Sequence, residues 1–173
     1  MFMMAAQIIL RDTAAHENSP AVIMEQANEM ICSHNREDMF VTIWLGILEI
    51  STGRLTATNA GHEYPVICRQ GGAYELYKDP HSAMVGGLEG MKYKEYEIQL
   101  QAGDRLFVYT DGVPEASDAQ QQMFGTERMI AALNEPADRP ADVLANVRKA
   151  VDGFTSGTEQ FDDLTMLCLE YKG

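Results

Sequence analysis

The sequence has few cysteines and few basic residues. Its three cysteines are widely separated and form no C-x-x-C pair, so neither a disulfide framework nor a zinc knuckle is predicted. The 13 lysines and arginines stand against 26 aspartates and glutamates, which gives a formal net charge of −13. This balance disfavours nucleic acid and anionic membrane surfaces as partners, because both attract positively charged proteins.

Several long or diagnostic segments are also missing. No run approaches the roughly 18–20 apolar residues of a membrane span. The apolar start MFMMAAQIIL has no basic segment before it and continues into Arg11 and Asp12, so we expect no signal peptide. The unpaired cysteines fit reduced thiols, and we therefore expect a cytoplasmic protein. Neither the phosphate-binding pattern GxxxxGK[ST] nor the serine-hydrolase pattern GxSxG occurs, which removes support for both chemistries.

What is present is a chain of ordinary globular composition, with 46% apolar residues over 173 positions. This length predicts a single domain over residues 1–173. Helices are expected at 1–15 and after Ser19-Pro20, where serine is a good N-cap and proline suits the first turn. The second helix should bury a stripe at helical spacing, formed by Ile23, Met24, Ala27, Met30 and Ile31.

The middle of the chain changes to a strand pattern, and two short helices precede a final strand. The expected strands are 41–50, 55–59, 66–68, 73–77, 93–100, 105–110 and 164–171, with a loop at 79–90. Hairpin connections between them predict a mainly antiparallel sheet with helices grouped outside it, the α+β class. Strands 41–50, 55–59, 105–110 and 164–171 are apolar enough to be interior.

Two acidic clusters mark the ends of expected strands. Asp111 and Gly112 follow strand 105–110, and Asp162 and Asp163 open the last one. Each cluster alone has an ordinary structural explanation, because aspartate caps turns and adjacent carboxylates are usually exposed. Together they could converge in a cleft, and such oxygen donors suit Mg²⁺ or Mn²⁺ better than zinc.

Three ordered segments resemble a known family: NAGHEYP (59–65), RLFVYTDGVPEA (105–116) and FDDLTMLCLEY (161–171). Over nearly the whole chain the sequence is similar to the metal-dependent protein phosphatase superfamily (PPM), in its bacterial SpoIIE-like branch. The resemblance implies an α-β-β-α sandwich of antiparallel sheets flanked by helices. It also implies a protein serine/threonine phosphatase that hydrolyses phosphoserine or phosphothreonine on a regulatory protein, of the anti-sigma-factor antagonist type.

The same resemblance implies a dinuclear Mn²⁺ or Mg²⁺ centre and attack by a metal-activated water. Asp111 matches the metal-binding aspartate of the TDG motif, with Gly112 beside it, and Asp162 matches that of the terminal DD motif, with Asp163 as its neighbour. No protein nucleophile is required.

One difference from the family concerns its first motifs. Members begin with GD-x-x-D and D-x-S-G-x-G, and neither occurs in these 173 residues. We therefore expect the domain to lack its first strands and the aspartate that bridges the two metals. An inactive or weakly active fragment, with unpaired sheet edges that favour a homodimer, would follow.

Two alternatives remain. The first is a non-catalytic regulatory or dimerisation module with the phosphatase fold, and the second is an unrelated acidic α+β binding domain. Both Asp111 and Asp162 are present, which favours descent from an active phosphatase over the first alternative. The second alternative requires three ordered motifs to match by chance.

Overall fold

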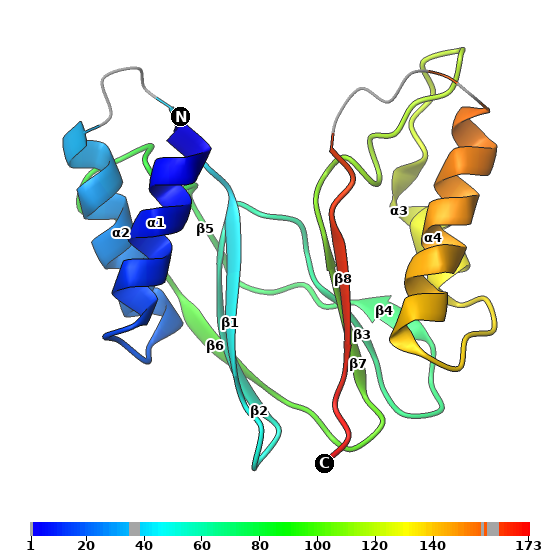
Figure 1. The fold of residues 1–173 in the computed structure, drawn as a ribbon, viewed down its shortest axis with the longest axis horizontal. Coiled ribbons are helices and arrows are strands. Elements are labelled where there is room, and N and C mark those ends of the chain that lie inside the picture. Colours follow the sequence, from blue (N-terminus) through cyan, green and yellow to red (C-terminus); the bar gives the residue numbers. More distant parts are fainter. Residues whose placement is uncertain (1, 35–38, 157, 159–162) are drawn as a thin grey trace. The chain divides into compact units, whose positions relative to one another are not determined.

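The chain folds into two compact units in a computed structural model, which describes residues 2–34, 39–156, 158 and 163–173. Unit 1 comprises Met1–His62 and Asp79–Leu100, and unit 2 comprises Glu63–Lys78 and Gln101–Gly173. Figure 1 shows that each unit combines a β-sheet with a pair of helices. That these units form the single domain predicted over residues 1–173 stays a prediction.

Unit 1 contains two helices and a four-stranded sheet in which β2 pairs with each of the other strands. Its elements are α1 (Phe2–Ala14), α2 (Pro20–His34), β1 (Ile43–Glu49), β2 (Arg54–Ala60), β5 (His81–Ser82) and β6 (Glu95–Gln99). The β1–β2 and β2–β6 pairs are antiparallel, and the short β2–β5 pair is parallel. Buried residues of both helices, including Ala6 and Met24, pack in one cluster with Ala60 of β2.

Helix α2 begins where the sequence indicates. The hydroxyl of Ser19 accepts a hydrogen bond from the backbone N–H of Val22, and Pro20 is the first helical residue. Four of the five predicted stripe residues are buried, but Met30 is 44% exposed. The buried polar residue in this helix is instead Asn28, whose amide donates to Leu88 O and accepts from Gly86 N–H.

Unit 2 contains a four-stranded antiparallel sheet in the order β4-β3-β7-β8 and two helices. Its elements are β3 (Val66–Cys68), β4 (Tyr74–Leu76), β7 (Arg105–Tyr109), α3 (Gly125–Leu133), α4 (Pro140–Thr155) and β8 (Met166–Glu170). Val143 and Val147 of α4 are fully buried against Phe107 of β7 in the core of the unit. The helices thus cover one face of the sheet, because residues of a strand alternate between its two faces.

The α+β class with mainly antiparallel sheets and outer helices is confirmed. The prediction of four interior strands is half right: β2 and β7 have partners on both sides, whereas β1 pairs only with β2 and β8 only with β7 among the described residues. The apolar composition of strand 164–171 wrongly indicated an interior position, and Leu167 of β8 is 52% exposed. No helix in the described part of the chain has the length and apolar character needed to cross a membrane.

Candidate metal centre

Asp111 lies in a tight turn directly after β7, as the sequence predicts. The backbone N–H of Val113 donates to Thr110 O at 3.0 Å, and that of Glu115 donates to Asp111 O at 2.9 Å. Gly112 and Val113 are buried, and Val113 belongs to the core of unit 2, while the Asp111 side chain is exposed. The turn is therefore anchored by its apolar residue and presents its carboxylate to solvent.

Thr110 joins this turn to the segment that opens β8. Its backbone N–H donates to Thr165 O at 3.0 Å. Its hydroxyl donates to Asp163 O at 3.1 Å and accepts from the Thr165 N–H at 3.1 Å. Three hydrogen bonds thus hold the TDG segment beside residues 163–165, although Thr110 and Asp163 are 53 positions apart in the sequence.

The second acidic cluster is described in part. Asp163 has an exposed side chain and lies beside Thr110 through its carbonyl group. Asp162 lies outside the described residues, so its predicted proximity to Asp111 stays a prediction. Within the described ranges, no group of three or more histidine, cysteine, aspartate or glutamate side chains is arranged to hold a metal ion.

The donors that are described fit a hard cation. Asp111 has an exposed carboxylate, and no lysine, arginine or histidine forms an ion pair with it in the described part of the chain. Asp163 follows Asp162 in the sequence and is tied to the same turn. Carboxylate oxygens of this kind suit Mg²⁺ or Mn²⁺. Asp111 and Asp163 are thus the described carboxylates that could hold such an ion, and the role of Asp162 stays a prediction.

A buried tyrosine precedes the same turn. Tyr109, the last residue of β7, is 3% exposed and stacks on Phe107 with ring centroids 5.5 Å apart. Its hydroxyl lies 3.5 Å from a carboxylate oxygen of Glu63, at the long limit for a hydrogen bond. Burial, followed by the negative charge of Glu63, raises the pKa of Tyr109. The phenol is therefore neutral at physiological pH and packs as part of the core.

The NAG segment forms a sharp corner in unit 1. Gly61 has a φ of +72°, a conformation that favours glycine. The amide oxygen of Asn59 accepts a hydrogen bond from the His62 N–H at 2.8 Å, which closes the corner. The amide nitrogen of Asn59 donates to both carboxylate oxygens of Asp79, at 3.2 and 3.1 Å. Asn59 is therefore a structural residue of this corner.

Asp79 is the centre of a buried polar network that the sequence did not suggest. Its side chain is 0% exposed and accepts from the Tyr96 hydroxyl at 2.5 Å, and His81 Nε2 lies 2.9 Å away. The Trp44 indole N–H donates to the Tyr96 hydroxyl at 2.8 Å. Buried carboxylates require such partners, because an unpaired one would carry a large desolvation cost. The weak sequence signal was an aspartate and a histidine in a stretch expected to be a loop.

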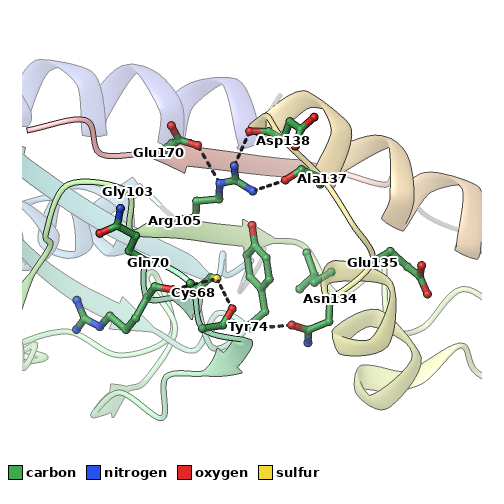
Figure 2. Close-up of a pocket in the computed structure, with 14 residues that line it drawn as sticks. Cys68, Gln70, Tyr74, Gly103, Arg105, Asn134, Glu135, Ala137, Asp138 and Glu170 are labelled. Carbon is green, nitrogen blue, oxygen red and sulfur yellow. Dashed lines mark hydrogen bonds and ion pairs between the residues drawn. The ribbon is translucent and has the colours of Figure 1, made fainter.

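A separate polar pocket of about 430 Å³ lies in unit 2, at the far end of β7 (Figure 2). Arg105, the first residue of β7, donates from Nε to Glu170 at 2.9 Å, and its other nitrogens donate to Ala137 O and Asp138 O. Asp111 is six positions further along, which corresponds to about 20 Å of extended strand. The pocket therefore holds none of the predicted site residues.

The sequence matches a known family, and the fold resembles that of solved phosphatase domains. Residues 1–172 match the family described as Stage II sporulation protein E (SpoIIE). The structure resembles the SiaA-PP2C domain of Pseudomonas aeruginosa, with a TM-score of 0.83, 17% identity and coverage of 99% of this chain and 69% of that one. The fold is thus that of a PP2C-type phosphatase domain. The chain belongs to the SpoIIE family.

Two further relatives are informative. Protein IcfG of Synechocystis is 30% identical over 136 residues, which cover 79% of this chain and 21% of that protein. This chain therefore spans about a fifth of the length of that curated relative. The phosphatase domain of SpoIIE from Bacillus subtilis, soaked with manganese, has a TM-score of 0.66 at 14% identity and covers 96% of this chain and 73% of that one.

Sequence reasoning missed the threonines that organise the site. Thr110 and Thr165 each lie next to the predicted segments, in TDG and DDLT, but only the carboxylates drew attention. Their roles depend on hydrogen bonds between segments that are distant in sequence. The sequence signal that could have indicated these roles was a threonine close to the aspartate in each motif.

Proposed function

We propose that the chain is the core of a metal-dependent protein serine/threonine phosphatase domain, acting on a phosphorylated regulatory protein of the anti-sigma-factor antagonist type. The observation that carries this proposal is the set of hydrogen bonds by which Thr110 holds the TDG turn beside residues 163–165. Family membership supports the reaction class. The polypeptide nature of the substrate rests on the resemblance described above.

Asp111 and Asp162 would hold the Mn²⁺ or Mg²⁺ ions, with Gly112 and Asp163 beside them. When bound, such ions lower the pKa of a water molecule and neutralise phosphate oxygens. Thr110 orients the Asp111 turn through its contacts with Asp163 and Thr165. Without these ions, the negative charges of the carboxylates would repel the phosphate dianion of the substrate. We therefore expect the chain to bind phosphate only when a cation is present.

These 173 residues by themselves should be weakly active. The GD-x-x-D segment, which supplies the metal-bridging aspartate in the family, does not occur in them. Mg²⁺ relies on few protein ligands, so the loss of one should weaken binding considerably. A non-catalytic module with the same fold is the alternative, and it requires no metal affinity at all.

The experiment compares two proteins, the 173-residue chain and a form extended at its N-terminus by a GD-x-x-D and D-x-S-G-x-G segment. Hydrolysis of p-nitrophenyl phosphate is measured with and without Mn²⁺. We expect negligible turnover by the short chain and metal-dependent turnover by the extended one. Asp111→Asn and Asp162→Asn in the extended form should abolish turnover, because a lost ligand removes the metal.

A matched control is Asp12→Asn, which removes an exposed carboxylate from α1 in unit 1. This variant should retain the turnover of the extended form. Robust turnover by the short chain would contradict the expectation of weak activity. Full turnover by Asp111→Asn would contradict the assignment of the metal centre, and no turnover by the extended form would favour the non-catalytic module.

A further inference from the structure

A hydrogen-bonded hairpin follows the turn that carries Asp111. Two backbone hydrogen bonds close its base, from Gly125 N–H to Pro114 O and from Phe124 N–H to Ala116 O, both at 2.8 Å. Ser117 and Met123 form an antiparallel bridge further along. Figure 1 shows this segment at the end of unit 2 where β8 begins. The hairpin, residues 114–125, is therefore continuous with the candidate metal centre.

The base of the hairpin is fixed in the core. Phe124 is 2% exposed, and its ring packs edge-on against Phe154 of α4 at a centroid distance of 5.6 Å. The Arg128 guanidinium donates to Phe124 O at 2.9 Å and to Met123 O at 3.3 Å. Substitutions at the tip should therefore leave the base and the core of unit 2 intact.

The tip is held by one aspartate. The Asp118 carboxylate accepts hydrogen bonds from the N–H groups of Gln120 and Gln122, both at 2.9 Å. Asp118 N–H in turn donates to Gln122 O at 3.0 Å. Such a loop has little conformational freedom left to lose when it binds a partner.

Backbone strain accompanies this order. Gln121 has a φ of +62°, and it is one of two non-glycine residues with positive φ in the described part of the chain. This conformation costs a non-glycine residue of the order of 1 kcal/mol, and such strain concentrates at functional sites. The strained residue lies in the exposed tip, because none of residues 119–123 is buried.

The exposed side chains of the tip can bind a polypeptide. Gln120 and Gln122 have amide groups that both donate and accept hydrogen bonds, as peptide groups do. Met123 is 60% exposed and offers an adaptable apolar contact. In a chain of net charge −13, these side chains carry no charge that would repel an acidic phosphopeptide.

We propose that this hairpin is a specificity element, and that Gln120, Gln122 and Met123 bind the polypeptide that flanks the phosphorylated residue. The inference rests on the proposed phosphatase function, because the substrate is taken to be a phosphoprotein. An aryl phosphate has no flanking chain, so the tip should matter for peptides much more than for small substrates.

The first test measures binding to the 173-residue chain at a Mn²⁺ concentration that saturates its metal binding, with fluorescent phosphoserine peptides of randomised flanking sequence as the probe. Replacing Gln120, Gln122 and Met123 together by alanine should weaken binding about tenfold, since a few contacts dominate such interfaces. Asp118→Ala keeps these three side chains but removes the hydrogen bonds that hold the tip, so it should also weaken peptide binding. Gln121→Gly retains the backbone conformation and should bind like the native chain.

The matched control is Gln101→Ala, which removes an exposed amide at the opposite end of β7. It should leave peptide binding unchanged. Equal binding by the native chain and the triple variant would overturn the proposal, as would a native chain that binds none of the peptides. This measurement does not require turnover, so failure of the inference can be distinguished from failure of the proposed phosphatase function.

The second test uses the extended form and compares turnover of the peptides with that of p-nitrophenyl phosphate. In the triple variant the ratio of peptide to aryl-phosphate turnover should fall about tenfold. An unchanged ratio would overturn the specificity role. Absence of aryl-phosphate turnover in the native extended form would instead count against the proposed function.

Discussion

The hydroxyl of Thr110 donates a hydrogen bond to the carbonyl oxygen of Asp163, 3.1 Å away. This contact joins the residue before Asp111 to the residue after Asp162. A metal centre assembled from two distant segments depends on such contacts, because the ligands themselves repel one another.

Thr110→Val should weaken Mn²⁺ binding about tenfold while retaining the size of the side chain, because residues that orient metal ligands typically have effects of this size. It should also lower the free energy of unfolding by about 1 kcal/mol for the lost hydrogen bonds. Isothermal titration with Mn²⁺ and urea unfolding provide the two measurements. Thr110→Ser keeps the hydroxyl and should behave like the native chain; equal Mn²⁺ affinity in all three proteins would contradict this role.

Metal binding should stabilise the native chain but not Asp111→Asn. At a free Mn²⁺ concentration ten times the dissociation constant, linkage predicts a gain of about 1.4 kcal/mol in the free energy of unfolding. The Asp111 side chain is exposed, so the substitution itself should have little effect on stability without metal. Urea unfolding with and without Mn²⁺ measures both quantities. A Mn²⁺-dependent gain in the variant equal to that of the native chain would argue against Asp111 as a ligand.

The sequence predicted the helices, most strands and the position of the Asp111 turn, because these follow from local patterns. It missed β5, which has two residues and is defined by parallel pairing with Asn59 and Ala60. It also assigned Met30 to the core in place of Asn28, whose burial depends on partners about 60 residues away. Hydrogen bonds between distant segments leave no periodic signal, which explains these errors.

Acid should remove the contribution of Asp104 to stability. Burial alone would raise the pKa of this carboxyl, but hydrogen bonds from the N–H groups of Gln101 and Gln70 and from Arg69 hold it below its usual value. A depressed folded-state pKa stabilises the fold above the unfolded-state value of about 3.9, and this stabilisation is lost as pH falls through the folded-state pKa.

Asp104→Asn should therefore lower the free energy of unfolding by about 2–4 kcal/mol at pH 7, because the buried charge is fully hydrogen-bonded. The difference from the native chain should shrink as pH falls below about 4. Urea unfolding across this pH range provides the measurement. Asp138→Asn, at an exposed position in the same unit, is the control and should have little effect at either pH. A loss that is the same at pH 7 and in acid would exclude the charge as its cause.

Self-association is expected because β1 and β8 each have one strand partner in the described part of the chain. Such edges expose backbone donors and acceptors that another chain can pair with. Light scattering over a range of protein concentrations should show a rise in average mass toward a dimer. A constant monomer mass would contradict the expectation.

The buried network of unit 1 can be followed through Trp44, which is the only tryptophan in the sequence. Tyr96→Phe removes the hydroxyl that accepts from the Trp44 indole and donates to Asp79. It leaves one hydrogen bond fewer on a fully buried carboxylate, so we expect a loss of about 1–3 kcal/mol in the free energy of unfolding. The fluorescence emission of Trp44 should shift in the folded state, because its N–H loses its partner.

A double-mutant cycle separates the network from general effects of each substitution. Trp44→Phe alone should cost less than Tyr96→Phe, because it leaves the hydrogen bond from Tyr96 to Asp79 in place. The two substitutions share one hydrogen bond, so their combined cost should fall short of the sum by about 0.5–1.5 kcal/mol. Urea unfolding of the four proteins gives the coupling energy. Strict additivity would show that the indole and the hydroxyl stabilise unit 1 independently.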